Sequence, residues 1–291
     1  MAESKIPVDL FNPGQVFACL GFMELADVLL GGAEAAFDWS DPKKTKFRLA
    51  ANGDKDPVEA AIGFVVGAEL KSVSPSIDEL NTAKWNVQTR GLGDDEAFPF
   101  PLPNSPATLP VELFKDGKAL QVNHWGDGTV RDNVKFWAGS GGYPGAALWR
   151  DAVDLVKENA TDAPQDPFAL SAPQSSSFRF DWRRDYVPLD AGFSPNEHSD
   201  MDMVGYPLVE LFAAVGLTYA RPQRPDRRNK LLYRYGVIGG DSDEFGLLPI
   251  PLLRAALGAQ DLPFPQRRFR MKLDWPGQEN QARCITAVTE E

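Results

Sequence analysis

Residues 12–30, NPGQVFACLGFMELADVLL, constrain the fold more than any other stretch because they mark a helix at both ends and along its length. Asn12 can cap the first free backbone amides, Pro13 stands at the first helical position, and the glycine pair 31–32 can adopt the left-handed backbone that ends a helix. Apolar residues recur at three- and four-residue spacing and broaden into a wide stripe. Its members are Val16, Phe17, Leu20, Met23, Leu25, Ala26, Val28, Leu29 and Leu30. The pattern predicts a mostly buried helix.

The segments that flank this helix predict strands. Asp56 is a candidate cap for a second helix, with Pro57 at its first position and Glu59 three residues after the cap. Alternating and β-branched or aromatic residues predict strands before and after both helices. The expected order is strand 6–10, helix 12–30, strands 34–39 and 45–51, helix 57–66 and strand 69–73. This βαββαβ order is that of a ferredoxin-like unit.

The middle of the chain is less regular. Residues 91–110 hold five prolines and no periodicity, which predicts a long loop. Two alternating runs flank Asp116-Gly117 within residues 111–125 and predict a hairpin. A strand is expected at 133–138, followed by a glycine-rich turn at 139–145 and a helix at 146–158. That turn lacks the spacing of a nucleotide-binding loop, so a tight turn is favoured over a phosphate site.

The second half repeats a similar order after a proline- and serine-rich linker at 161–177. Apolar spacing predicts strand 178–182, helix 204–217, strand 230–238, helix 250–257 and a terminal hairpin of strands 267–275 and 282–288. We therefore predict an α+β protein with two parts. Residues 1–160 form a ferredoxin-like unit with an inserted hairpin, and residues 174–291 form a divergent, arginine-rich ferredoxin-like half.

Charge is distributed unevenly between these parts. The formal net charge is -11, which argues against a free-standing nucleic-acid binder because phosphate contacts need positive potential. Residues 1–173 carry a balance of -10 and residues 174–291 only -1, and 13 of the 15 basic residues in the second part are arginine. Arginine suits bidentate phosphate contacts and base stacking, although solvated arginines paired with nearby acids are an equal alternative.

Two basic segments of the second half are candidate nucleic-acid contacts. The first is a proline-stiffened loop that leads into Tyr233 and Tyr235, and basic groups beside exposed aromatic rings suit a sugar-phosphate chain with stacked bases. The second is a strip in which alternate residues of the terminal strand share a face. The candidate residues are Arg221, Arg224, Arg227, Arg228 and Lys230 in the loop, and Arg268, Arg270 and Lys272 in the strip.

No convincing catalytic set is present in the sequence. His124 has no acid-base partner marked nearby, and a structural histidine is favoured over a general base. His198 lies among Glu197, Asp200 and Asp202, whose spacing is not that of a calcium loop and predicts an acidic surface loop. We expect no metal and no cofactor.

Compartment is indicated by the ends of the chain and by its cysteines. The N-terminus lacks the basic and apolar regions of a signal peptide, and the apolar runs are broken short of about 18 residues, so no membrane association is expected. Cys19 and Cys284 are the only cysteines, which gives no support to a disulfide framework. The expected location is cytoplasmic.

Three segments together carry a resemblance to a known family. They are IPVDLFNPGQVFACLGFMELADVLLGGAEAAFDW at 6–39, FRFDWRRDYVPLDAGFSPN at 178–196 and YPLVELFAAVGLTYARP at 206–222. These residues resemble a CRISPR-associated family found beside type I-G (formerly I-U) effector genes. The resemblance implies a cytoplasmic subunit of an RNA-guided surveillance complex, built from ferredoxin-like units and without catalytic residues of its own.

The sequence therefore predicts a non-catalytic subunit of a CRISPR effector complex in antiviral defence. Its arginine-rich half would contact guide RNA, target DNA or neighbouring subunits, and the negative net charge favours an accessory subunit that binds protein neighbours. One alternative is a ferredoxin-like endoribonuclease that processes CRISPR RNA through His124. Another is a stand-alone protein-interaction module that works through its acidic half.

Overall fold

The structure is a computed structural model that describes residues 1–74, 87–96, 111–123, 145–159, 166–174, 177–185, 203–229, 231–242, 245–274 and 283–291. The predicted strand 133–138 and the proline-rich residues 97–110 lie outside the described residues, as do residues 139–144 of the glycine-rich turn.

A large mixed sheet has the strand order β1-β3-β2-β10-β12-β13, with the short β11 paired to β2. Its strands are β1 (Ala2–Pro7), β2 (Glu34–Asp38), β3 (Lys46–Ala51), β10 (Leu232–Gly240), β11 (Leu248–Pro249), β12 (Gln266–Asp274) and β13 (Cys284–Glu290). Neighbours are antiparallel except β2 and β10, which run parallel through the pairs Gly239–Phe37 and Gly240–Asp38. This parallel pair joins the two predicted parts of the chain within one sheet.

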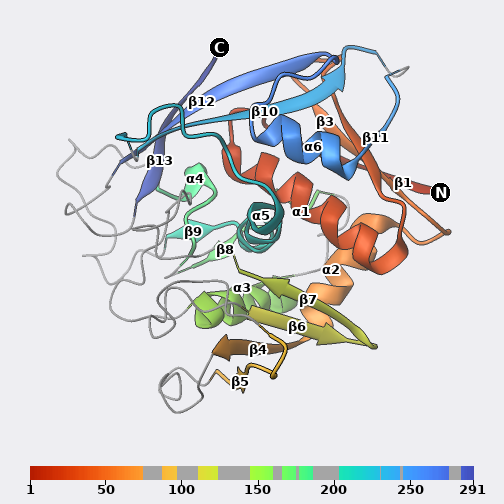
Figure 1. The fold of residues 1–291 in the computed structure, drawn as a ribbon, viewed down its shortest axis with the longest axis vertical. Helices are drawn as coiled ribbons and strands as arrows, with labels where there is room; N and C mark the ends of the chain where they lie inside the picture. The colour runs from red at the N-terminus through yellow and green to blue at the C-terminus, as the bar shows by residue number, and fades with distance from the viewer. Residues whose placement is uncertain are drawn as a thin grey trace.

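Smaller sheets and the helices complete the α+β architecture. A second sheet has the order β5-β4-β6-β7, and β8 pairs with β9. Their strands are β4 (Glu69–Ser74), β5 (Thr89–Gly91), β6 (Val111–Lys115), β7 (Lys118–Val122), β8 (Ala172–Pro173) and β9 (Val204–Gly205). The helices are α1 (Pro13–Leu30), α2 (Pro57–Gly67), α3 (Gly145–Asn159), α4 (Trp182–Asp185), α5 (Pro207–Tyr219) and α6 (Ile250–Leu257). Figure 1 shows α1 and α5 between the large sheet and the β4–β7 sheet.

The predicted α+β class is confirmed, and the strands of the first unit depart from the ferredoxin-like order at one point. The arrangement β1-β3-β2 is the one expected for the first three strands. The fourth strand should then lie beside β1, but β4 pairs with β5 and β6 instead. The predicted hairpin of β6 and β7 belongs to this second sheet, and Asp116 (φ 51) and Gly117 (φ 76) form its left-handed turn.

The central helix α1 has the predicted ends, but Asn12 does not cap it. Gly31 (φ 78) and Gly32 (φ 60) adopt the left-handed backbone at its C-terminus, as predicted. The side chain of Asn12 is fully buried and makes no capping bond; its Nδ2 donates to Asp181 Oδ1 at 3.0 Å instead. The second predicted cap is confirmed: Asp56 Oδ1 accepts from the amides of Val58 and Glu59 at 2.8 and 2.9 Å.

Helices α1 and α5 cross at very short range, and this crossing lies within the hydrophobic core. A Cβ added at Gly21 would lie 1.9 Å from the carbonyl oxygen of Phe212, and one at Gly216 would lie 2.1 Å from that of Phe17. The rings of Phe22 and Phe212 stack beside the crossing with centroids 3.6 Å apart. Such backbone contact requires glycine on both helices. The two predicted parts therefore share one hydrophobic core.

One strand of the second half is wrongly predicted. Residues 178–180 are not a strand, and Trp182 begins the short helix α4. The segment passes over the start of α1, where a Cβ on Gly14 would lie 2.4 Å from the carbonyl oxygen of Phe180. The alternation of Phe178, Phe180 and Trp182 resembles a strand, but it reflects two rings buried in the core beside a tight backbone contact.

By length and composition α1 could cross a membrane, but 78% of it is buried by the rest of the protein, as in the core helix of a soluble protein. Its burial follows from its position between the large sheet and α5.

Replacing Leu20 with alanine tests whether α1 organises the core. Leu20 is 3% exposed, so truncation should lower the free energy of unfolding by about 2–5 kcal/mol. The matched control is Val28→Ala on the same helix, where the side chain is 37% exposed and the change should stay within about 0.5 kcal/mol. Urea unfolding measures both, and equal midpoints for the two variants would contradict the assignment of Leu20 to the core.

Candidate nucleic-acid interface

The predicted basic strip lies on the outer face of β12. Phe269, Met271 and Leu273 point inward and are fully buried, so Arg268, Arg270 and Lys272 point outward. The predicted alternation of the terminal strand is therefore confirmed.

The arginine loop lies beside the strip because it pairs with β10. Gln223 and Arg234 exchange backbone hydrogen bonds, each 2.8 Å long, and Arg234 is in turn paired with Arg270 of β12. Paired residues of antiparallel strands project to the same face, so Gln223, Arg234 and Arg270 form a row across the sheet. We call the surface formed by the 221–229 loop, Arg234 and the outward residues of β12 the basic face.

The expectation of exposed tyrosines beside this loop is wrong. Tyr233 and Tyr235 are 1% and 0% exposed and point into the core, on the side opposite to Arg234. The hydroxyl of Tyr235 donates to the carbonyl oxygen of Leu10 at 2.7 Å, and burial raises its pKa well above the usual value. Neither ring can stack on a base. Arg234 is the outward residue between them, and the strand alternation could have identified it.

The four strand cations of the basic face are paired with carboxylates of the same chain. Arg268 pairs with Asp261 at 2.5 Å, Lys272 with Asp274 at 3.4 Å, and Arg234 with Glu291 at 2.7 Å; Arg270 also pairs with Glu291. Exposed pairs of this kind contribute only about 0–1 kcal/mol each, so a phosphate can displace them at small cost. The strip therefore carries less free positive charge than its sequence suggests.

Two loop arginines are the unpaired cations of the basic face. The side chains of Arg227 and Arg228 are exposed and form no ion pair with any carboxylate that the structure describes. Asp226 shapes the turn instead, because its carboxylate accepts the amide of Arg228 at 2.8 Å. Of the other candidates, Arg221 is exposed and Arg224 half-buried, and Lys230 lies outside the described residues.

A buried polar cluster lies beneath the segment 177–185, at the start of α1 and α5. Asp181 is fully buried and accepts from Asn12 and, through both oxygens, from the guanidinium of Arg183, with a shortest distance of 2.6 Å. Glu210 of α5 is also fully buried and accepts the amides of Phe180 and Asp181 at 3.3 and 3.0 Å. This cluster fixes the residues 178–185 that carry part of the family resemblance.

The electrostatics of Glu210 are unusual. Burial raises the pKa of its carboxyl to about 8, and the negative charge of Asp181 adds to this, while the two amide donors oppose it. The carboxyl is therefore mostly protonated at neutral pH. Its side chain is fully buried and binds the backbone of the 178–185 segment at Phe180 and Asp181.

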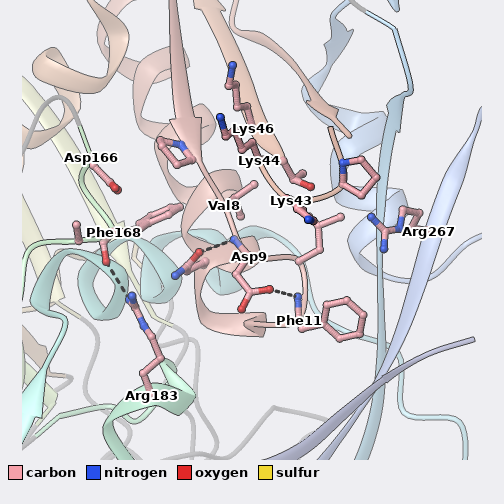
Figure 2. A pocket seen from close by; sticks show the side chains of 16 residues that line it. Val8, Asp9, Phe11, Lys43, Lys44, Lys46, Asp166, Phe168, Arg183 and Arg267 are labelled. Carbon is pink, nitrogen blue, oxygen red and sulfur yellow. Dashed lines mark hydrogen bonds between the residues drawn. The ribbon is translucent and has the colours of Figure 1, made fainter. Parts of the chain in front are cut away.

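The sequence did not indicate a further feature, a cavity of about 520 Å³ beside the start of α1. Figure 2 shows that its walls come from three separate parts of the chain: the segment that joins β1 to α1, the turn between β2 and β3, and the 166–169 segment with Arg183. Arg267 of β12 closes another side. Its basic lining residues are Lys43, Lys44, Lys46, Arg183 and Arg267. The signal that could have found it is the run of three lysines within residues 43–46.

The residues considered for chemistry are not brought together in the described part of the chain. His124 and the cluster of Glu197, His198, Asp200 and Asp202 lie outside it. Among the residues that the structure describes, no group of three or more His, Cys, Asp or Glu side chains could hold a metal ion. Cys19 and Cys284 are buried free thiols.

Comparison with protein-family models, with curated proteins and with solved structures finds no match to this chain. The resemblance to a CRISPR-associated family therefore rests on the three sequence segments alone and stays a prediction.

Proposed function

We propose that this protein is a cytoplasmic, non-catalytic subunit of a CRISPR RNA-guided effector complex and that its basic face contacts the sugar-phosphate backbone of guide RNA or target DNA. The complex and the location are supported by the sequence resemblance. The ferredoxin-like origin of both halves belongs to the same proposal, supported by the β1-β3-β2 order. Contact with nucleic acid is supported by one structural observation, the pairing of Gln223 with Arg234, which aligns the arginine loop with the strip.

The arrangement of the basic face favours a single strand that crosses β10 and β12. Adjacent strands of a sheet are about 4.8 Å apart, so the row of Gln223, Arg234 and Arg270 is about 10 Å long, and its cations are Arg234 and Arg270. Arg227 and Arg228 of the same loop add exposed cations that form no ion pair among the described residues. Because no aromatic ring among the described residues stands exposed beside Arg234, we expect binding through phosphates, without preference for sequence.

The salt dependence of binding tests this contact. Arg227→Gln combined with Arg228→Gln removes two unpaired cations from an exposed turn, so the fold should be unchanged. If both arginines contact phosphates, the magnitude of the logarithmic salt slope for a single-stranded RNA should fall by about 0.7 per contact, at most about 1.4. Fluorescence anisotropy with a labelled RNA, repeated over a range of salt concentrations, measures the slope.

The matched control removes two exposed lysines elsewhere, through Lys55→Gln and Lys157→Gln near α2 and on α3. It changes the net charge by the same amount but removes no residue of the basic face. The salt slope should therefore equal that of the wild type. Equal salt slopes for the wild type, the arginine variant and the control would contradict a contact between the loop and RNA.

Co-purification with proteins encoded beside this gene tests the subunit assignment separately. A stable complex that contains small RNA supports it. A complex without RNA would favour the protein-interaction module, and cleavage of repeat RNA by the protein alone, lost in His124→Ala, would favour the endoribonuclease.

A further inference from the structure

The cavity beside the start of α1 is separate from the basic face. Arg267 lines the cavity, whereas Arg268, the next residue of β12, projects from the opposite face of the strand and pairs with Asp261. The two surfaces therefore lie on different sides of the large sheet at this strand. A ligand of the cavity does not compete for the residues of the basic face.

The rim of the cavity carries unpaired positive charge. Lys43, Lys44 and Lys46 are exposed, and none lies within ion-pair distance of a carboxylate in the described part of the chain. The turn that carries Lys43 and Lys44 is shaped by Asp41, whose side chain accepts the amide of Lys43 at 3.0 Å and whose carbonyl accepts that of Lys44 at 2.9 Å. Lys46 follows as the first residue of β3, and these three lysines differ from the paired cations of β12.

The two arginines of the cavity are held in place by the protein. Arg183 binds Asp181, donates to the carbonyl oxygen of Phe168 at 2.9 Å, and lies over the ring of Tyr206 with its Cζ 3.4 Å from the ring centroid. Arg267 is bound through two nitrogens to Glu290 at 2.6 and 2.8 Å. Fixed guanidinium groups lose little conformational entropy when a ligand binds, but these carboxylates offset their charge, so the net positive charge of the cavity lies at the lysine rim.

Asp9, the acid near the centre of Figure 2, is hydrogen-bonded to the backbone. Asp9 accepts the amide of Phe11 through Oδ1 at 2.9 Å, and its own amide donates to Gln15 Oε1 at 2.7 Å. These bonds hold the 8–11 segment and present the ring of Phe11, which is 37% exposed and packs edge-on against Phe269 at 5.2 Å. The cavity thus combines a cationic rim with an accessible aromatic ring.

We propose that this cavity binds a phosphorylated nucleotide, with its phosphates at the lysine rim and its base against Phe11. A volume of about 520 Å³ lies within the range of small-molecule sites, about 300–1,000 Å³. Lysine ammonium groups bind phosphate as point charges, and a phenylalanine ring offers a stacking surface to any base. The same chemistry is presented by a free nucleotide and by the phosphorylated end of an RNA strand.

Binding of defined probes by the full chain tests the proposal. Isothermal titration with ADP should give saturable binding, and adenosine should bind much more weakly because it lacks the phosphates. Lys43→Gln combined with Lys44→Gln should weaken ADP binding about tenfold or more, since charged hydrogen bonds are lost. The pair Lys55→Gln and Lys157→Gln, equal in charge, should bind ADP like the wild type.

A second variant separates the base from the phosphates. Phe11→Ala should weaken the affinity for ADP several-fold and leave the affinity for inorganic pyrophosphate unchanged. An equal loss of affinity for both probes would contradict the contact between the base and Phe11. To distinguish the two sources, a short 5′-phosphorylated RNA is compared with the same RNA ending in a 5′-hydroxyl. Tighter binding of the phosphorylated strand, with competition by ADP, identifies a strand end, whereas equal RNA binding beside saturable ADP binding identifies a free nucleotide.

The proposal is overturned if neither ADP nor the phosphorylated RNA binds saturably, or if the lysine variant binds them as the wild type does. Its failure is distinct from failure of the basic face, because the Arg227 and Arg228 variant leaves all the cavity residues intact.

Discussion

Replacing Gly21 with alanine is expected to destabilise the protein by at least about 3 kcal/mol, at or above the upper end of the range for overpacked cores. The added methyl group would lie 1.9 Å from the carbonyl oxygen and 2.8 Å from the carbonyl carbon of Phe212, and both atoms belong to the backbone of α5. Because backbone atoms cannot turn aside as side chains do, the two helices must separate, and the stack of Phe22 on Phe212 must open. Urea or thermal unfolding measures the loss.

The control is the same substitution at Gly63, inside α2. Outside its own helix backbone and chain neighbours, no atom of the described residues lies within 4 Å of a Cβ added there, so Gly63→Ala should stabilise the protein by about 0.5–1 kcal/mol through helix propensity. Opposite signs for one chemical change isolate the crossing as the cause. A Gly21→Ala variant as stable as the wild type would mean that α1 and α5 do not meet in this way.

The second large effect concerns pH and Glu210. Burial raises the pKa of Glu210 to about 8 in the folded protein, from 4.5 for the free side chain. Between these two values the folded state holds a proton that the unfolded state has released, so stability falls as pH rises through this window, by at most about 1.4 kcal/mol per pH unit. This contribution is fully present below pH 4.5 and is lost as pH rises through about 8.

Glu210→Gln should remove this dependence. At pH 5 the variant should be less stable than the wild type, because its amide nitrogen cannot accept one of the two backbone N–H groups that Glu210 binds. As pH rises to 9, the difference in unfolding free energy should shrink or reverse by a few kcal/mol. Subtracting the two curves cancels the groups that both proteins share.

An exposed glutamate provides the comparison. Glu59 in the first turn of α2 is exposed, so Glu59→Gln removes a carboxyl that is not buried and is measured over the same range of pH 5 to 9. The contradicting outcome is a Glu210→Gln curve of unfolding free energy against pH that runs parallel to that of the wild type over this range. Glu210 would then not have a raised pKa, and burial in this cluster would not disfavour its charged form.

The sequence was a good guide wherever a local signal specified the structure. The left-handed glycines after α1, the cap at Asp56 and the turn at Asp116-Gly117 each encode a backbone geometry by themselves, and all are found. The errors arose where contacts between residues far apart in the sequence determine the structure. Asparagine is a residue type that commonly caps helices, but the side chain of Asn12 binds Asp181, which lies 169 residues away in the sequence.

The same distinction explains the candidate site. Strand alternation sufficed to place Arg268 and Arg270 on one face, but the burial of Tyr235 depends on contacts with Phe17 of α1 and with Leu10, which no local pattern of β10 reveals. Ion pairs such as Arg268 with Asp261 and the cavity walls drawn from four parts of the chain likewise depend on tertiary packing. The sequence could identify charged segments and not their partners.

The crossing of α1 with α5 has a consequence for synthesis of the chain. Helix α1 is complete at Leu30, but the helix that covers it ends at Tyr219, which is 189 residues later. At about 5–20 residues per second, roughly 10–40 s separate the two on the ribosome. During that interval α1, one of the most apolar segments of the nascent protein, has no α5 to pack against. Its exposed apolar surface is of the kind that chaperones bind.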